Sequence, residues 1–233
     1  ILGIDNIIFI YISANKLPKN QIRKATLLGL ALAMITRILL LFSVSYLIAL
    51  KDPFYNVDLG WFKTGLTGQS LILFFGGLFL LYKSTKEIRE KVEHTNEDEV
   101  VKSPKVISFS NVIIQIILID IVFSFDSILT AVGMTNGIDG ALIIMVIAVI
   151  ISILIMMIFA NPISNFVNRN PTIQMLALSF LILIGFMLIT EGAHLSHTEI
   201  FNKSVGAIPK GYLYFAIAFS LGVEMLNLKI RKK

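Results

Sequence analysis

The fold is decided by the stretch Ile113-Ile-Gln-Ile-Ile-Leu-Ile-Asp120-Ile-Val-Phe-Ser-Phe-Asp126-Ser-Ile-Leu-Thr-Ala-Val-Gly133. It is long enough to cross a bilayer as one helix, which takes about 17 to 25 residues. Asp120 and Asp126 interrupt its apolar character. A carboxylate at the centre of a bilayer costs roughly 2.5 kcal/mol or more, unless it is paired, protonated or bound to a cation. An ion pathway through a membrane protein is therefore the leading hypothesis.

The composition indicates an integral membrane protein with an all-α fold. Hydrophobic residues make up 56% of the 233 positions, more than soluble domains carry. The absence of cysteine excludes disulfides and thiolate metal sites. The net charge of +5 does not indicate nucleic acid, because the basic residues flank the apolar segments. No Walker loop, nucleophile elbow, zinc-protease motif or dinucleotide fingerprint occurs, so we expect no enzyme and no required cofactor.

Apolar runs predict a polytopic bundle of seven helices, at residues 1–13, 22–50, 66–82, 106–133, 140–160, 173–190 and 211–228. The first of these begins in mid-helix without an initiating Met, so we expect it to be truncated. Several spans are close to the short limit for crossing a bilayer, which leaves a six-helix bundle as the alternative.

Basic residues predict the orientation. Fifteen Lys and Arg fall in the loops at 14–24, 83–105 and 161–172 and in the tail at 229–233, against four on the opposite side, Lys51, Lys63, Lys203 and Lys210. This asymmetry places the first side in the cytoplasm, with the N-terminus outside and the C-terminus inside, as expected for a bacterial inner membrane protein. The loop at 83–105 has six basic and six acidic residues. It is predicted to be a solvated cytoplasmic linker, with a metal-sensing or docking loop as the alternative.

The two halves of the chain are similar. Gly3-Ile-Asp5-Asn-Ile-Ile resembles Ser124-Phe-Asp126-Ser-Ile-Leu, and Gly77-Leu-Phe-Leu-Leu-Tyr-Lys83 resembles Gly185-Phe-Met-Leu-Ile-Thr-Glu191. Residues 1–82 and 106–190 are therefore predicted to be three-helix repeats of opposite orientation, with 191–233 supplying an outer loop, a seventh helix and a basic tail. Inverted repeats with a site near the midplane are typical of secondary transporters.

Oxygen-bearing side chains form two stripes at helical spacing: Asp120, Ser124 and Ser127, and Ser220, Glu224 and Asn227. We expect the stripes to face each other across a cavity, although membrane serines often bond only their own backbone. Asp120 and Asp126 are about 120° apart on a straight helix, so they share a site only if the helix bends or unwinds. Asp5 and Asn6 add a carboxylate and an amide at mid-depth, or else cap a helix end.

Three further features accompany these ligands. Arg37 is predicted to pair with Asp120 or Asp126, or to act as a moving gate charge. Glu191 is either an outer-gate carboxylate or a surface residue. His194 and His197 have a spacing that suits a transition metal, although loop histidines are usually solvated.

The charge balance favours a cation site. Four acids, Asp5, Asp120, Asp126 and Glu224, face the single Arg37, which leaves an intramembrane charge of −3. Such an excess requires bound cations or protons. Oxygen ligands without cysteine sulfur suit Mg²⁺, Ca²⁺ or Mn²⁺.

Three motifs resemble the TerC family of integral membrane proteins: Gly3-Ile-Asp5-Asn6-Ile-Ile-Phe9, Asp120-Ile-Val-Phe-Ser-Phe-Asp126-Ser, and Ile208-Pro-Lys-Gly-Tyr212 followed by Phe219-Ser-Leu-Gly-Val-Glu224-Met-Leu-Asn227. The resemblance covers essentially the whole chain. It implies membership of the LysE-type transporter superfamily, a link to tellurium resistance and manganese export, and a metal pathway through Asp5, Asn6, Asp120, Asp126 and Glu224. The upstream part of the first helix, which in the family supplies a further acidic residue just before Asp5, is expected to be missing from this sequence.

The favoured hypothesis is a secondary exporter of divalent cations, Mn²⁺ above all, that works by alternating access and exchanges metal for protons. Its partners would be the lipid bilayer, the metal and protons. A non-transporting membrane scaffold in metal or envelope stress is the alternative from a different class, and a cation channel also remains open. The sequence leaves open a homo-oligomer or a membrane-protein partner.

Overall fold

The computed structural model describes residues 9–43, 46, 48, 50–96, 108–135 and 137–231. Its helices confirm the predicted all-α polytopic bundle. After a first helix, described over residues 9–14, come α2 (Lys19–Phe42), α4 (Gly68–Asn96), α5 (Phe109–Thr135), α6 (Ala141–Arg169), α7 (Pro171–Leu195) and α8 (Lys210–Arg231). Within the described part of the chain, five helices (α2, α5, α6, α7 and α8) are long and apolar enough to cross a membrane.

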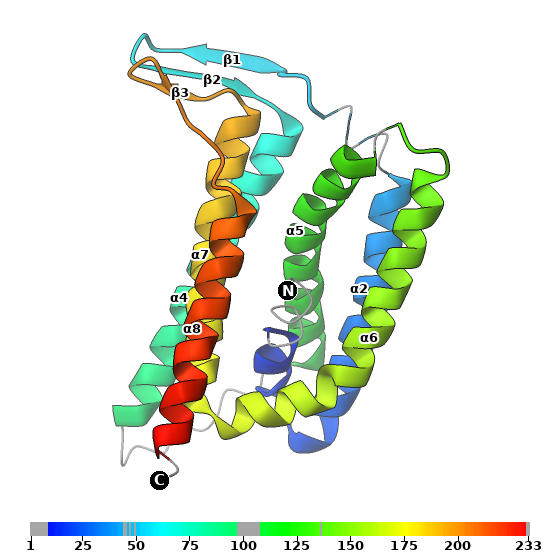
Figure 1. The fold of residues 1–233 in the computed structure, drawn as a ribbon, viewed down its shortest axis with the longest axis vertical. Helices are drawn as coiled ribbons and strands as arrows, with labels where there is room; N and C mark the ends of the chain where they lie inside the picture. The colour runs from blue at the N-terminus through cyan, green and yellow to red at the C-terminus, as the bar shows by residue number, and fades with distance from the viewer. Residues whose placement is uncertain are drawn as a thin grey trace.

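The helices form two groups, with α4, α7 and α8 in one and α2, α5 and α6 in the other (Figure 1). The most extensive packing is between α4 and α7, and α2 packs on both α5 and α6. The α6–α7 turn and the C-terminal end of α8 lie at one end of the bundle, and a small sheet lies at the other (Figure 1). The α6–α7 connection and the end of α8, which the sequence assigned to the same side of the membrane, thus lie at the same end of the bundle.

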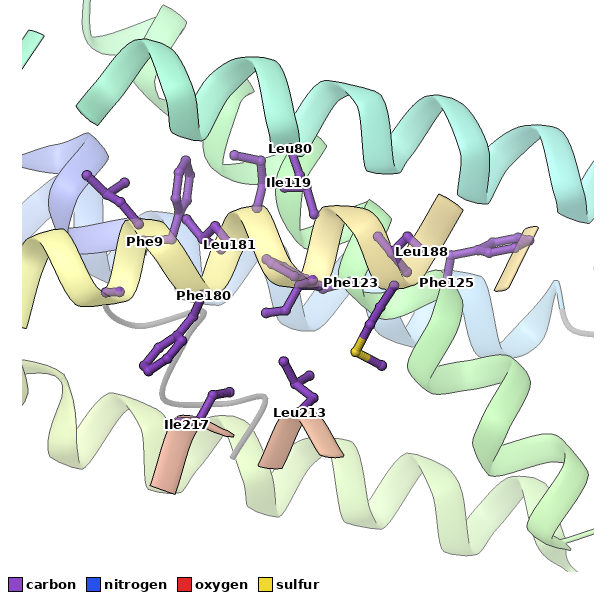
Figure 2. Packing of buried hydrophobic residues seen from close by; sticks show 14 of the residues in the cluster. Phe9, Leu80, Ile119, Phe123, Phe125, Phe180, Leu181, Leu188, Leu213 and Ile217 are labelled. Carbon is purple, nitrogen blue, oxygen red and sulfur yellow. The ribbon is translucent and has the colours of Figure 1, made fainter. Parts of the chain in front are cut away.

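The core lies around α7. Figure 2 shows Leu181 and Leu188 of α7 among Leu80 of α4, Phe123 of α5 and Leu213 of α8, all of them buried. Lipid tails are as apolar as leucine, so the packing of such helices depends on van der Waals fit and on small residues that permit close approach, rather than on the removal of apolar surface from water.

The closest fit is at the crossing of α4 and α7. A Cβ added to Gly77 would lie 2.6 Å from the Gly185 carbonyl oxygen, and a Cβ added to Gly185 would lie 3.0 Å from the Gly77 carbonyl oxygen. The two glycines occupy equivalent positions in the predicted repeats. Reciprocal contact between equivalent residues is what a pseudo-two-fold axis through this crossing would produce; the inverted repeats themselves stay a prediction.

Helices α4 and α6 extend furthest beyond their predicted ends. Residues 83–96, assigned to a solvated loop, continue α4 to Asn96. Ion pairs one helical turn apart support this extension, with Lys83 Nζ 3.2 Å from Glu87 Oε1 and Arg89 Nε 2.6 Å from Glu93 Oε1. Residues 97–107 lie outside the described residues.

Helix α6 was predicted to end at 160 and instead continues through Pro162 to Arg169. Proline lacks an amide N–H and its ring clashes with the preceding turn, which bends a helix. In Figure 1 the last part of α6 accordingly turns across the end of the bundle toward α7.

The sheet was not predicted. Its strands β1 (Tyr55–Asp58), β2 (Phe62–Leu66), β3 (Glu199–Ile200) and β4 (Lys203–Ser204) are antiparallel neighbours in that order. The β2–β3 pairing joins the connection before α4 to the connection after α7. Where the sheet meets the bundle, the buried Thr64 and Thr198 hydroxyl oxygens are 2.8 Å apart.

Candidate functional site

Asp120 forms a buried ion pair with Arg37. The arginine on α2 donates from Nη2 to Asp120 Oδ1 at 2.5 Å and from Nε to the same oxygen at 3.2 Å. Ser124, one turn further along α5, donates to Oδ2 at 3.2 Å. Asp120 is only 2% exposed. The sequence predicted that Arg37 pairs with either Asp120 or Asp126. In the structure its partner is Asp120.

Asp126 forms an ion pair with a different basic residue. Lys210, the first residue of α8, donates from Nζ to Asp126 Oδ2 at 2.8 Å and to Thr130 Oγ1 at 2.6 Å. Because α5 is continuous from Phe109 to Thr135, the two aspartates keep the separation of about 120° expected of a straight helix. Asp120 meets α2 and Asp126 meets α8, so the two carboxylates do not share a site.

Asp126 and Lys210 line a pocket together with Glu191 of α7, and the other lining residues are Phe123, Ile184, Met187, Leu188, Leu213 and Tyr214. The sequence predicted Glu191 to be either an outer-gate carboxylate or a surface residue. In the structure Glu191 is half-buried and lines the same pocket as Asp126. Two carboxylates and one ammonium give this pocket a formal charge of −1. Its cavity of about 20 Å³ has room for one water-sized species. Apolar walls strengthen attraction between a cation and these carboxylates.

A second cavity lies between α2, α5 and α6, with a volume of about 270 Å³. Arg37, Ser127 and Ser152 are among its lining residues. The predicted ligand Ser127 donates its hydroxyl to the carbonyl oxygens of Phe123 at 2.9 Å and Ser124 at 3.1 Å. The cavity could hold several waters at about 30 Å³ each, which would give the Arg37–Asp120 pair contact with solvent.

The stripe on α8 lies far from Asp120. Helices α5 and α8 run in opposite directions from the Asp126–Lys210 contact. At about 1.5 Å per residue, Glu224 lies about 21 Å below that contact and Asp120 about 9 Å below it. Glu224 instead accepts a hydrogen bond at 3.4 Å from Asn227 on its own helix. The structure therefore does not bring the two predicted stripes together.

Two predicted ligands, Asp5 and Asn6, lie outside the described residues. Within the described ranges, no group of three His, Cys, Asp or Glu side chains is arranged to hold a metal ion. His194, considered for a transition metal, has its Nδ1 3.3 Å from the Val205 carbonyl oxygen.

Sequence reasoning missed Lys210 as a site residue, because it counted this lysine among the outer loops. Pro209 was a usable signal, since a proline often directly precedes or begins a helix and so places Lys210 in the first turn. Including Lys210 changes the intramembrane charge from −3 to −2. The charge argument for a cation site is correspondingly weaker than the sequence suggested.

An ionic cluster at the opposite end of the bundle was also missed. Lys16 Nζ is 2.6 Å from Glu87 Oε1 and 2.8 Å from Glu90 Oε2, and Lys83 Nζ is 3.2 Å from the same Glu87 oxygen. Burial lowers the pKa of Lys16, but the hydrogen bonds that its ammonium donates to Glu87 and Glu90 outweigh burial, and the pKa is raised. Burial raises the pKa of Glu90, but Lys16 outweighs it and the pKa is lowered. The cluster ties the turn after the first helix to α4.

Comparison with known proteins identifies the family. The model of the "Integral membrane protein TerC family" matches residues 1–232. The chain belongs to the TerC family. Curated TerC relatives include a UPF0053 protein of Haemophilus influenzae, 44% identical over 232 residues that span this whole chain and 90% of the relative. The UPF0053 inner membrane protein YgdQ of Escherichia coli K12 is 45% identical over 233 residues, all of this chain and 89% of YgdQ.

A longer TerC relative, the UPF0053 inner membrane protein YoaE of Escherichia coli K12, is 41% identical over 232 residues, which make up all of this chain but 41% of YoaE. No solved structure matches the chain. The family, the inner-membrane names of YgdQ and YoaE and the apolar helices together identify an integral membrane protein, as the sequence predicted.

Proposed function

We propose that this TerC-family protein is a secondary-active transporter that exports divalent metal cations, with Mn²⁺ as its main substrate, in exchange for protons. The observation that carries the proposal is the pocket shared by Asp126, Glu191 and Lys210. There an ammonium already lies against a carboxylate between apolar helices. The pocket thus has the charge and the oxygen ligands for a small cation.

A transport cycle could work in this pocket if a metal ion and protons bind the same carboxylates in turn. A divalent ion would neutralise Asp126 and Glu191 together and displace Lys210 from its carboxylate. Protonation of the two carboxylates would then release the metal on the other side. Exporting a divalent ion against a negative interior costs roughly 4.6 kcal/mol per 100 mV, and two entering protons return about the same amount. A two-for-one exchange would therefore be independent of voltage.

The chemistry of the ligands supports the choice of metal. Carboxylate and hydroxyl oxygens suit Mn²⁺, Mg²⁺ and Ca²⁺ better than metals that prefer sulfur. For export, the end that carries the basic connections would face the cytoplasm, with the N-terminus outside and the C-terminus inside.

A non-transporting membrane scaffold is the second candidate, because a specific observation favours it. Asp120 and Asp126 each have a basic partner, Arg37 and Lys210. A protein that only needs to stabilise acids inside a membrane would pair them in this way. A scaffold does not require the second carboxylate, Glu191, in the pocket that holds the Asp126–Lys210 pair.

The test is export of Mn²⁺ by the full chain and two matched variants. Asp126→Asn removes the pocket charge and keeps its shape, whereas Asp139→Asn makes the same change at an exposed position outside the pocket. In manganese-sensitive cells, we expect the wild type and Asp139→Asn to lower cytosolic manganese and Asp126→Asn to leave it high. Equal manganese in all three strains and in cells without the protein would favour the scaffold.

A channel would differ from a carrier in the same proteins reconstituted into vesicles. Carrier flux saturates with Mn²⁺ concentration and follows an imposed pH gradient. Flux that rises linearly with concentration and follows voltage alone would favour the channel.

A further inference from the structure

The small sheet has one apolar and one polar face. The register pairs Tyr55 with Leu66, Val57 with Thr64 and Phe62 with Ile200, and such directly opposed residues lie on the same face. Side chains alternate between faces along a strand. The other face therefore receives the intervening residues, Asn56, Asp58, Lys63, Gly65, Glu199 and Ser204. Three of the four charged residues in the strands are on this polar face.

The apolar face continues beyond the helices. Thr64 and Thr198 are buried where the sheet joins α4 and α7. On the same apolar face, Tyr55 is 61% exposed and Ile200 is 41% exposed. Figure 1 shows the sheet crossing the end of the bundle and extending past α4 and α7. Part of an apolar surface is thus left without a protein neighbour among the described residues.

Aromatic residues gather at the tip of the sheet. Trp61, in the turn between β1 and β2, is 55% exposed, and Phe201, between β3 and β4, is 72% exposed. Their ring centroids are 5.9 Å apart. The amide of Phe201 donates to the Trp61 carbonyl oxygen at 2.7 Å, which holds the two turns together. Tryptophan with neighbouring aromatics is typical of the boundary between lipid headgroups and acyl chains.

Aromatic side chains are also exposed on the helices below the sheet. Phe75 of α4 and Phe186 of α7 are 62% and 54% exposed, on helices of a membrane protein. The sheet lies at the ends of these helices, where the bilayer surface must pass. Its one charged residue on the apolar side, Lys203 opposite Ile200, is on the last strand. A lysine there can extend its ammonium into water while its stem stays against lipid.

We propose that the apolar face of this sheet lies on the phospholipid bilayer, with Trp61 and Phe201 at the headgroup boundary. The partner is the lipid surface that surrounds α4 and α7. The sheet then acts as a membrane anchor for the two connections that it joins. This role is independent of whether the protein transports metal.

The chain provides its own probe, because Trp61 is its only tryptophan. The full chain is reconstituted into phosphatidylcholine vesicles, and tryptophan emission is recorded with lipids brominated near the headgroup end of the acyl chain. We expect a blue-shifted emission that brominated lipid largely quenches and that aqueous iodide leaves largely unchanged.

Two further variants compare the faces of β1, each in a Trp61→Phe background. Tyr55→Trp places the fluorophore on the apolar face and Asn56→Trp on the polar face of the same strand. We expect lipid quenching for the first variant and iodide quenching for the second. Iodide quenching at Trp61 and at both β1 positions would overturn the proposal. So would shielding of Trp61 from both quenchers, which would indicate that a protein partner or a second copy covers the sheet.

Discussion

The contact between Lys210 and Asp126 makes a testable energetic prediction. Lys210→Met removes the ammonium and keeps most of the apolar stem, leaving Asp126 unpaired in a mostly buried position. At 2.8 Å and an effective dielectric constant near 20, the gross attraction is about 6 kcal/mol. Removing one member of a buried pair typically costs about 3–5 kcal/mol. Because the Lys210 side chain is 27% exposed, we expect a cost near the lower limit.

The assay is a double-mutant cycle on denaturant unfolding in detergent at neutral pH. Lys210→Met should lower the free energy of unfolding by about 3 kcal/mol. Combining it with Asp126→Asn should restore much of that loss, because no unpaired charge remains. Lys51→Met is the matched control, since this exposed lysine should contribute within about 0.5 kcal/mol. The coupling energy between positions 126 and 210 should be about 1–3 kcal/mol.

The same variant separates a structural pair from a site that binds a cation. If Lys210 occupies the position of a transported ion, its removal should tighten Mn²⁺ binding by about tenfold or more, since each tenfold corresponds to about 1.4 kcal/mol. A coupling energy near zero would refute the energetic reasoning. Unchanged Mn²⁺ affinity together with strong coupling would leave the pair purely structural.

Three further predictions concern other parts of the fold. Gly77→Ala should cost about 1–3 kcal/mol, because its Cβ would press on the α7 backbone, whereas Gly222→Ala, with open space around it, should be neutral or stabilising by up to about 1 kcal/mol; equal denaturation midpoints would contradict this. Glu90 has a lowered pKa in the folded protein, so its contribution is present above its ordinary value of 4.5 and lost as the pH falls through the folded pKa; melting temperature against pH should fall less steeply on the acid side for Glu90→Gln than for wild type. Arg37→Leu should cost about 3–5 kcal/mol by leaving Asp120 buried without its arginine, and adding Asp120→Asn should recover most of it; a double variant as unstable as the single one would show that the arginine acts by packing.

Local periodicity predicted much of the bundle, and the cost of an isolated charge in lipid predicted one of its ion pairs. The angle between Asp120 and Asp126 followed from helix geometry alone, because nothing in α5 breaks its hydrogen bonding. The pairing of Arg37 with an α5 aspartate followed from the cost of an isolated charge in lipid.

The sequence did not predict the contact between Lys210 and Asp126, because this contact depends on which helices are neighbours. Apolar helix surfaces are alike, so no pattern shows that α8 begins beside Asp126, and Lys210 was missed for that reason. Other errors had local signals that went unused. The alternation in Tyr55–Asp58 and Phe62–Leu66 is typical of strands. The i,i+4 pairing of Lys83 with Glu87 is typical of a helix.

The pairing of β2 with β3 has a consequence for how the protein is made. Phe62 pairs with Ile200, which lies 138 positions further along the chain. At about 5–20 residues per second, translation needs roughly 7–28 s to supply the second half of this sheet. During that interval the edge of β2 lacks its partner β3, and the apolar face of the hairpin lacks the end of α7. The nascent chain therefore carries an exposed, aggregation-prone hairpin until α7 has inserted, and nearby lipid is the surface that can shelter it.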